Sequence, residues 1–249
     1  MDHAASTPWT PYQPPRQQTR RLLSAEGHAY DIVVATPEGP APAQGFASIL
    51  VLDGGRYFPA VAAGVRALSH RPQKTGVEPL VVIGVCHDEA DGRLEDARAR
   101  DFPSTPSPEP GPSRPEGQGD AFRRFLTEEV LSAAGHVAPL DPGRRALFGH
   151  SLGGLFVIET REARPDLFAR WVSISPSLWW RTPDALIAGP EVLVGYGEAE
   201  TRRDMRSRIE AWATAKADDR PRRSMAKGAD HGSAPFALLP DALRHASSA

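Results

Sequence analysis

The chain has 249 residues, of which 40% are hydrophobic and 24% are charged, and its formal net charge at pH 7 is −2. This composition supports a sizeable core and excludes a wholly disordered chain. The near-neutral charge excludes the global basic field that holds nucleic acid or anionic lipid. The single cysteine, Cys86, excludes an intrachain disulfide framework and a zinc site built from cysteines.

No apolar run approaches the roughly 18 residues that a membrane-spanning helix requires. The N-terminus lacks the apolar centre of a signal peptide, and we interpret residues 1–18 as a polar arm that carries several prolines. We therefore expect a single α/β domain over residues 1–249, located in the cytoplasm.

Apolar runs and segments with helical spacing alternate along the rest of the chain. Strands are predicted at 29–36, 46–52, 79–86, 144–148, 171–174, 192–196 and 222–226. Helices are predicted at 57–69, 120–135, 152–162, 201–216 and, at least in part, 235–245. Asp120 is expected to cap the second of these helices. Continuous apolar strands separated by helices predict a mostly parallel sheet that is covered on both faces, with the ligand crevice at the carboxyl ends of the strands.

Six prolines fall within residues 102–119. Proline fixes φ and lacks a backbone N–H donor, so these prolines exclude a helix or a central strand within this segment. A long insertion of this kind is either a solvated excursion or a functional wall or lid over a site, and the sequence leaves both interpretations open.

The run Gly149-His150-Ser151-Leu152-Gly153 matches the pattern G-x-S-x-G between a predicted strand and a predicted helix. In this context the serine lies on a tight turn with its hydroxyl exposed, and the glycines leave room for neighbouring backbone. The start of the helix also favours developing negative charge. Ser151 is therefore the candidate nucleophile, and the alternative is a glycine-rich turn with a capping serine. We expect His150 to have a packing role.

A nucleophilic serine needs a base and an orienting acid, which α/β-hydrolases supply in the chain order serine, acid, histidine. Only His231 and His245 follow Ser151. His231 lies in the loop before the C-terminal helix, where the base of this fold belongs, whereas His245 lies in a polar tail that we expect to be solvated. His231 is therefore the candidate base.

The acid should follow the predicted strand 192–196, where Glu198 and Glu200 lie two residues apart. In an extended chain such residues share a face, and only one of them need reach the histidine. Glu200, three residues past Gly197, is the preferred candidate, and Glu198 is the alternative. Either glutamate could instead pair with the arginines that follow, which are Arg202, Arg203 and Arg206.

The oxyanion of a tetrahedral intermediate needs two backbone N–H donors. One is expected from Leu152, the residue after the nucleophile. The other should come from the loop after the strand that ends at Leu52, because glycines there let the backbone approach a substrate closely. Gly55 is our candidate in this loop, and Asp53 is expected to hold the loop in place.

Six blocks of the sequence together resemble the "putative esterase" family of the α/β-hydrolase superfamily. They are Leu52-Asp53-Gly54, Arg98-Ala99-Arg100-Asp101-Phe102-Pro103, Gly149-His150-Ser151-Leu152-Gly153-Gly154, Ile174-Ser175-Pro176-Ser177-Leu178-Trp179-Trp180, Gly197-Glu198-Ala199-Glu200 and His231-Gly232-Ser233. The serine block is generic, whereas the arginine and tryptophan blocks are more specific. The blocks look most like the branch that hydrolyses the trilactone of catecholate siderophores such as enterobactin and salmochelin.

This resemblance implies an α/β-hydrolase fold and a serine esterase that acts through an acyl-enzyme. A ferric catecholate is a flat-sided aromatic anion, so Arg98 and Arg100 could supply cationic contacts, and Trp179 and Trp180 could pack on its rings. Tyr57 is a further candidate contact. In the alternative interpretation Trp180 packs in the core. Each arginine could likewise form a surface ion pair with Glu95, Asp96 or Asp101.

Within the same chemistry, the alternatives to a siderophore lactone are a small acyl ester and acyl transfer of the mycolyltransferase type. A non-catalytic binding protein on a hydrolase scaffold is a third alternative. We expect no cofactor and no metal site, because His87 and Asp88 have no third ligand at a helical or strand spacing. The expected partner is a small ester, with no nucleic acid and no membrane, and any iron would arrive with the substrate.

Overall fold

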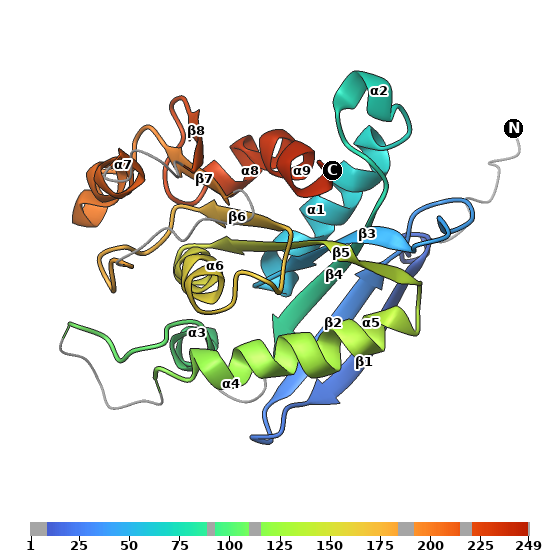
Figure 1. Cartoon of the computed structure of the whole chain (residues 1–249), viewed down its shortest axis with the longest axis horizontal. Coiled ribbons are helices and arrows are strands. Elements are labelled where there is room, and N and C mark those ends of the chain that lie inside the picture. The colour runs from blue at the N-terminus through green and yellow to red at the C-terminus, as the bar shows by residue number, and fades with distance from the viewer. Residues whose placement is uncertain (1–8, 89–92, 110–115, 184–191, 215–220, 249) are drawn as a thin grey trace, which may run out of the picture.

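A computed structural model describes residues 9–88, 93–109, 116–183, 192–214 and 221–248. Its centre is an eight-stranded sheet with the order β1-β2-β4-β3-β5-β6-β7-β8 (Figure 1). The strands are β1 (Gln17–Leu23), β2 (Ala29–Ala35), β3 (Phe46–Val51), β4 (Leu80–His87), β5 (Leu140–His150), β6 (Arg170–Ile174), β7 (Val192–Gly197) and β8 (Arg222–Ala226). β2 is antiparallel to both of its neighbours, and all other pairs are parallel. The predicted mostly parallel sheet is confirmed.

Helices cover both faces of this sheet (Figure 1). One face carries α1 (Gly54–Leu68), α8 (Ala234–Ala237) and α9 (Leu239–Ser247). The other carries α3 (Leu94–Asp101), α4 (Gly119–Arg124), the π-helical η2 (Phe125–Val130), α5 (Leu131–Gly135), α6 (Leu152–Ala163) and α7 (Met205–Thr214). Two short elements complete the set, α2 (Pro72–Thr75) and η3 (Arg202–Asp204).

The central strands are buried on both faces, which explains why they appear in the sequence as continuous apolar runs. All six residues of β3 are buried. Successive residues of a strand point to opposite faces, so Leu50 packs with the α6 side of the sheet while Ile49 and Val51 pack with the α1 side. The sheet therefore separates two apolar cores.

Strand register brings the chemistry-bearing loops to one edge of the sheet. His150, the last residue of β5, pairs with Ile174, and Ile174 pairs with Gly195 of β7. β3 pairs with β5 on the other side. The carboxyl ends of these parallel strands consequently meet where the open-sheet rule places a ligand crevice.

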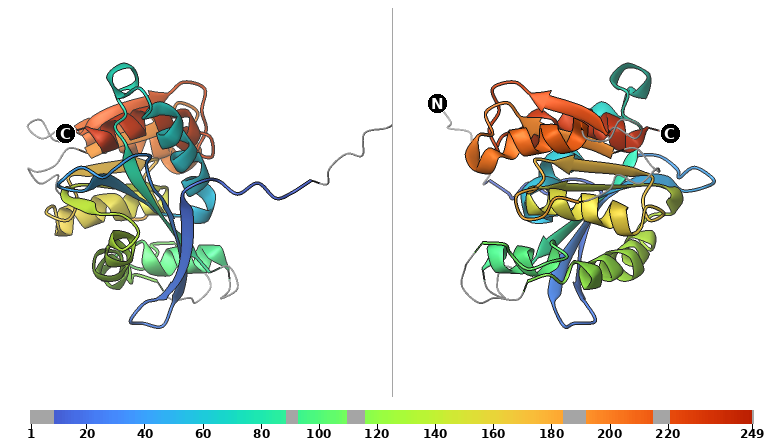
Figure 2. Two further views of the ribbon diagram at one scale, coloured as in Figure 1. Left: turned by 90° about the vertical axis from the view of Figure 1, so that its right-hand side faces the viewer. Right: turned by 60° about the vertical axis from the view of Figure 1, so that its left-hand side comes forward.

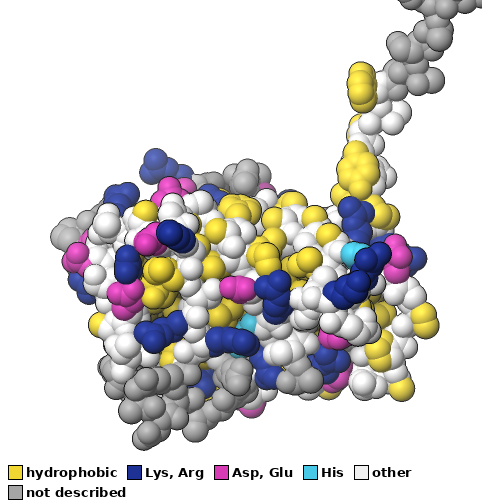
Figure 3. Space-filling view, turned by 90° about the horizontal axis from the view of Figure 1, so that it is seen from above, with side chains coloured by type: hydrophobic (Ala, Val, Ile, Leu, Met, Phe, Trp, Pro, Cys, Tyr) yellow, Lys and Arg dark blue, Asp and Glu magenta, His cyan; other side chains and the backbone are white. Residues whose placement is uncertain are grey.

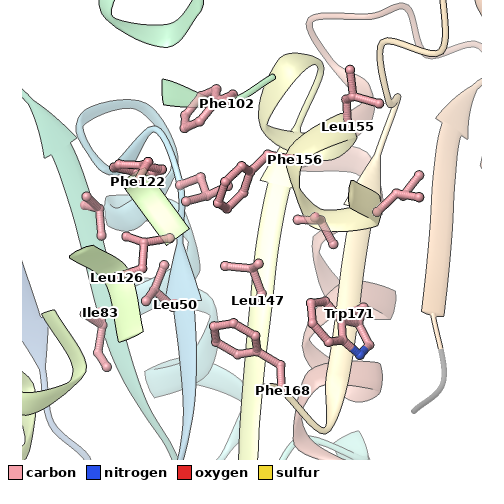
Figure 4. Packing of buried hydrophobic residues seen from close by; sticks show 14 of the residues in the cluster. Leu50, Ile83, Phe102, Phe122, Leu126, Leu147, Leu155, Phe156, Phe168 and Trp171 are labelled. Atoms are coloured by element: carbon pink, nitrogen blue, oxygen red, sulfur yellow. The ribbon is translucent and has the colours of Figure 1, made fainter. Parts of the chain in front are cut away.

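The proline-rich insertion is anchored in the core at its first residue. Phe102 is fully buried, and its ring lies 5.7 Å from that of Phe122 and 6.0 Å from that of Phe156 between centroids (Figure 4). The described residues 103–109 and 116–118 form neither helix nor strand, in agreement with the prolines. The segment predicted over 102–119 ends one residue earlier than expected, because α4 begins at Gly119.

Strand β1 is a feature that sequence patterning misses. The sequence predicts a polar arm through residue 18, whereas β1 begins at Gln17 and pairs with β2 along its length. β1 is an edge strand with mostly exposed side chains, so it lacks the apolar alternation that identifies a strand. The described residues before it, from residue 9 on, extend away from the body of the molecule (Figures 2 and 3), and Trp9 and Tyr12 are exposed.

Three predictions at helix ends are wrong. Asp120 does not cap α4; it lies in the first turn and its carboxylate pairs with Arg123. The helix predicted from residue 201 begins only at Met205, because the preceding 3-10 turn contains Arg203 in a left-handed conformation. His245 is buried rather than solvated, because the amphipathic helix α9 packs against the sheet. Residues 215 and 216 of the predicted helix lie outside the described residues.

The surface carries both signs of charge. On the face shown in Figure 3, basic and acidic side chains are interspersed, as expected for a net charge of −2. Among the described residues, no helix is long and apolar enough to cross a bilayer.

Core packing around Phe102 leads to a stability prediction. Truncating Phe102 to alanine leaves a cavity against Phe122 and Phe156, and we expect the free energy of unfolding to fall by about 3–5 kcal/mol. The matched control is Phe236→Ala, since Phe236 is 48% exposed and should cost less than about 1 kcal/mol. Urea denaturation followed by circular dichroism measures both. Equal losses in the two variants would contradict this description of the core.

Candidate active site

Ser151 lies on the turn between β5 and α6 with a strained backbone, at φ 59° and ψ −117°. This turn is closely packed. A Cβ on Gly149 would lie 2.2 Å from the Gly153 carbonyl oxygen, and one on Gly154 would lie 2.8 Å from the Ile174 carbonyl oxygen. Only glycine fits at these two positions, because neighbouring backbone approaches closely. Gly149 is the first glycine of the pattern, whereas a Cβ on its second glycine, Gly153, would meet nothing nearer than 3.6 Å. Strain of this kind is concentrated at functional sites.

The structure brings Ser151, His231 and Glu200 into one hydrogen-bonded chain. Ser151 Oγ lies 3.1 Å from His231 Nε2, and His231 Nδ1 lies 3.1 Å from Glu200 Oε2. A carboxylate only accepts hydrogen bonds, so Nδ1 carries the imidazole proton and donates it. Nε2 is then free to accept the proton of the serine hydroxyl, which is the arrangement that a general base requires.

Glu200 is buried and surrounded by donors. Its Oε1 accepts hydrogen bonds from the Ser175 hydroxyl and from the Gly197 backbone N–H, the latter at 2.7 Å. Burial alone would raise the pKa of Glu200, but the hydrogen bonds from His231, Ser175 and the Gly197 N–H outweigh it and lower the pKa below its usual value. The carboxylate is therefore ionised at neutral pH and can orient His231.

Glu198, the alternative acid, serves the turn after β7 instead. Its Oε2 accepts a hydrogen bond of 2.8 Å from the Gly228 N–H, and its carbonyl accepts one of 3.2 Å from Arg206. Neither contact involves His231. The structure thus places Glu200, and not Glu198, beside the imidazole.

Two serines at the end of β6 belong to the site and were not among the candidates from sequence. Ser177 Oγ lies 3.3 Å from Ser151 Oγ, and the Ser177 N–H donates to the Ser151 carbonyl at 3.0 Å. Ser175, which donates to Glu200, adopts a left-handed φ of 47°. The sequence feature that could have identified both serines is their position directly after β6. This strand lies next to β5, at the edge of the sheet where the catalytic loops meet.

The start of α6, next to Ser151, lies against the loop between β3 and α1. A Cβ on Gly153 would lie 3.6 Å from Asp53 Oδ2, so the start of α6 abuts the loop after β3. Helix N-termini present backbone N–H groups without intrahelical partners and a positive dipole end. Leu152 begins α6, and Gly55, in the first turn of α1, borders open space. This arrangement suits the predicted oxyanion donors.

Arg98 holds the loop after β3 rather than facing open solvent. Its Nε and Nη2 donate to the two carboxylate oxygens of Asp53, at 2.7 and 3.1 Å. Both side chains are largely buried, and Asp53 adopts a left-handed φ of 52°. The pair therefore fixes the position of Gly55, and the sequence-based assignment of Arg98 to the substrate is not what this geometry favours. The partner was not among the expected acids, because Asp53 is 45 residues away in the chain.

Arg100 also has a framework partner. It donates to Asp101 through Nε at 2.6 Å and lies beside the Tyr30 hydroxyl, which itself donates to Asp101 at 2.7 Å. His87 Nε2 completes this buried cluster at 3.0 Å from Asp101. Burial, together with the negative charge of Asp101, raises the pKa of Tyr30. The pair with Asp101, which the sequence analysis gives as the alternative for Arg100, is observed.

Tyr57, in the first turn of α1, packs against His150. It is buried, and its hydroxyl donates to His150 Nδ1 at 2.8 Å. His150 Nε2 in turn donates to the backbone carbonyl of His231 at 2.9 Å. Burial, with smaller contributions from His231 and Arg98, lowers the pKa of His150 well below its usual value, so this ring is neutral. The expected packing role of His150 is therefore to tie α1 to the loop that carries His231.

The two tryptophans have different environments. Trp180 is buried in the core, as the alternative interpretation expected, and its indole N–H donates to the Thr105 carbonyl at 3.0 Å. Trp179 is half-buried, and the guanidinium of Arg203 lies 3.6 Å from its ring centroid. Only Trp179 of this pair is placed to meet a ligand.

The part of the chain that the structure describes contains no group of three or more histidine, cysteine, aspartate or glutamate side chains that could hold a metal ion. The groups that converge on Ser151 are those of acyl-transfer chemistry, namely a nucleophile, a base and an orienting acid.

Comparison with known proteins adds independent evidence. Residues 24–232 match the family model described as "Putative esterase". The ferri-bacillibactin esterase BesA of Bacillus subtilis is 34% identical over 172 residues, which are 66% of this chain and 59% of that protein. The siderophore enterobactin esterase of Emericella nidulans is 30% identical over 213 residues, which are 78% of this chain and 69% of that protein. The chain thus spans less than two thirds of the bacillibactin esterase.

Solved structures agree on the fold. The BES protein from Bacillus cereus superposes with a TM-score of 0.87 at 25% identity, over 99% of this chain and 100% of that one. The siderophore hydrolase EstA from Aspergillus nidulans superposes with a TM-score of 0.73 at 20% identity, over 97% and 96% of the two chains. With the family match over most of its length, this chain belongs to the "Putative esterase" family and has an α/β-hydrolase fold.

Proposed function

We propose that this protein is a serine esterase that hydrolyses carboxylic esters through an acyl-enzyme. The observation that carries this proposal is the hydrogen-bonded chain from Glu200 through His231 to Ser151 on a strained turn. Membership of an esterase family supports it.

The geometry supports the following sequence of steps. Ser151 Oγ attacks the ester carbonyl carbon while its proton passes to His231 Nε2. The oxyanion of the tetrahedral intermediate accepts hydrogen bonds from the N–H groups of Gly55 and Leu152. The imidazolium then gives its proton to the departing alcohol oxygen, which leaves the acyl group on Ser151. Water, deprotonated by His231, releases the acid and restores the serine.

Glu200 acts on His231 and not on the substrate. Its ionised carboxylate keeps the proton on Nδ1 and stabilises the imidazolium that forms in each half-reaction. Ser175 and the Gly197 N–H hold the other carboxylate oxygen, so Glu200 cannot rotate without breaking these hydrogen bonds.

For the substrate, we infer a lactone ester of a catecholate siderophore. Relatives at 30–34% identity are named as esterases of ferri-bacillibactin and of enterobactin. Trp179 offers an aromatic face stacked under a cation, which suits an aromatic anion. A small acyl ester is the alternative within the same mechanism.

The substrate prediction is tested with a panel of esters. Purified protein is incubated with apo and ferric enterobactin, p-nitrophenyl acetate and p-nitrophenyl butyrate, and the products are followed by mass. We expect rapid linearisation of the trilactone and none with Ser151→Ala, because the nucleophile is absent. Turnover of the p-nitrophenyl esters alone would keep the serine mechanism and overturn the siderophore assignment.

The acid prediction is tested with two matched substitutions. Glu200→Gln keeps the shape but loses the charge that orients His231, and we expect kcat to fall on the order of 10²–10⁴-fold. Glu198→Gln changes an equivalent side chain that contacts Gly228 and not His231, so kcat should be nearly unchanged. Initial rates on p-nitrophenyl butyrate compare the two. A larger loss of kcat in Glu198→Gln than in Glu200→Gln would contradict this prediction and identify Glu198 as the acid.

A further inference from the structure

Arg203 has an unusual combination of contacts. Its guanidinium lies over the Trp179 ring at 3.6 Å, and its Nη2 donates to Glu109 Oε2 at 2.6 Å. The side chains of Arg203 and Glu109 are 38% and 50% exposed. The arginine is thus stacked on an aromatic ring on one side and neutralised by an exposed carboxylate on the other.

These contacts join the proline-rich insertion to two segments that carry residues of the site. Trp179 is two residues past Ser177, whose hydroxyl contacts the nucleophile. Arg203 is three residues past Glu200, the partner of His231. Glu109 belongs to the proline-rich insertion, which also contacts the tryptophan pair through the Thr105 carbonyl. The Trp179–Arg203–Glu109 cluster therefore lies where the insertion meets two catalytic loops.

The backbone under Arg203 is strained to reach this position. Arg203 and Asp204 both have left-handed φ values, 55° and 53°, although neither is glycine. This strain breaks the helix that the sequence predicts from residue 201. Left-handed conformations of ordinary residues persist only where surrounding structure imposes them, and they cluster at functional sites.

Arg203 differs from the two arginines that the sequence favoured as substrate contacts. The side chains of Arg98 and Arg100 are 12% and 14% exposed and pair with buried carboxylates. If either arginine turned to a substrate anion, its buried carboxylate partner would be left unpaired. The exposed partner of Arg203 can return to water at little cost. An incoming anionic group can therefore take the place of Glu109.

We propose that Arg203, held on Trp179, selects esters with an anionic aromatic acyl group, and that Glu109 is an internal competitor that occupies this arginine until such a group binds. The inference rests on the proposed esterase function and adds the residues that set its preference. The planar guanidinium can stack on a ring and at the same time donate hydrogen bonds from its edge to an anionic oxygen.

Kinetics test the proposal with two esters that differ by one carboxylate group, p-nitrophenyl 4-carboxybenzoate and p-nitrophenyl benzoate. The quantity measured is the ratio of their kcat/KM values. Arg203→Gln should lower this ratio about tenfold, since a charge-assisted hydrogen bond is lost. Glu109→Gln should raise it several-fold, because the competitor has lost its charge. An unchanged ratio in both variants would overturn the proposal.

The control is Asp166→Asn, which removes the carboxylate of another exposed arginine pair. Arg164 and Asp166 are 55% and 63% exposed and bonded at 2.8 Å, but they lie beyond α6. The charge ratio should not move in this variant. A shift equal to that of Glu109→Gln would show a general effect of protein charge and would count against a local role of Glu109.

A binding measurement separates this proposal from the esterase function. In the Ser151→Ala background, calorimetry compares 2,3-dihydroxybenzoate with its neutral amide. We expect tighter binding of the acid, abolished by Arg203→Gln and strengthened by Glu109→Gln. If no ester is hydrolysed but this pattern holds, the esterase proposal fails and the anion site stands. If esters are hydrolysed and the acid and amide bind alike in all variants, the anion site fails alone.

Discussion

The catalytic arrangement depends on how His231 is held, because its loop has little regular structure of its own. Two hydrogen bonds hold His231 in place. Glu200 accepts one from the imidazole ring of His231, and the neutral His150 donates the other to the backbone carbonyl of His231. The first comes from the end of β7 and the second from the end of β5. The parallel register of the sheet therefore determines whether the imidazole reaches Ser151.

Buried charges around the site serve the framework. Asp53 pairs with Arg98 and so attaches α3 to the loop that precedes α1. Asp101, at the end of α3, pairs with Arg100 and contacts Tyr30 of β2 and His87 of β4, which attaches the helix to the sheet. Ion pairs at such depth are costly to open, so they are suited to fixing geometry rather than to exchanging ligands. Exchange is left to the exposed cation Arg203, at the margin where the proline-rich insertion meets the catalytic loops.

The sequence predicts those features of the fold and of the site that leave a pattern among neighbouring residues. The central strands are recognised because burial on both faces makes them apolar throughout, and Ser151, His231 and Glu200 are found because chain order and turn chemistry restrict the choice. The edge strand β1 has no such pattern. The hydrogen bond between Tyr57 and His150 joins residues that are 93 positions apart, and no spacing rule reveals a contact of that kind.

Two hydroxyl groups lie side by side at the centre of this site, those of Ser151 and Ser177, 3.3 Å apart. The central claim is that Ser151 alone is acylated, because only its Oγ contacts His231. The most direct test is to quench the enzyme during turnover of p-nitrophenyl butyrate at low pH and locate the butyryl group by peptide mass mapping. An adduct on Ser151 is the predicted result. An adduct on Ser177, or turnover without any adduct, would contradict the account.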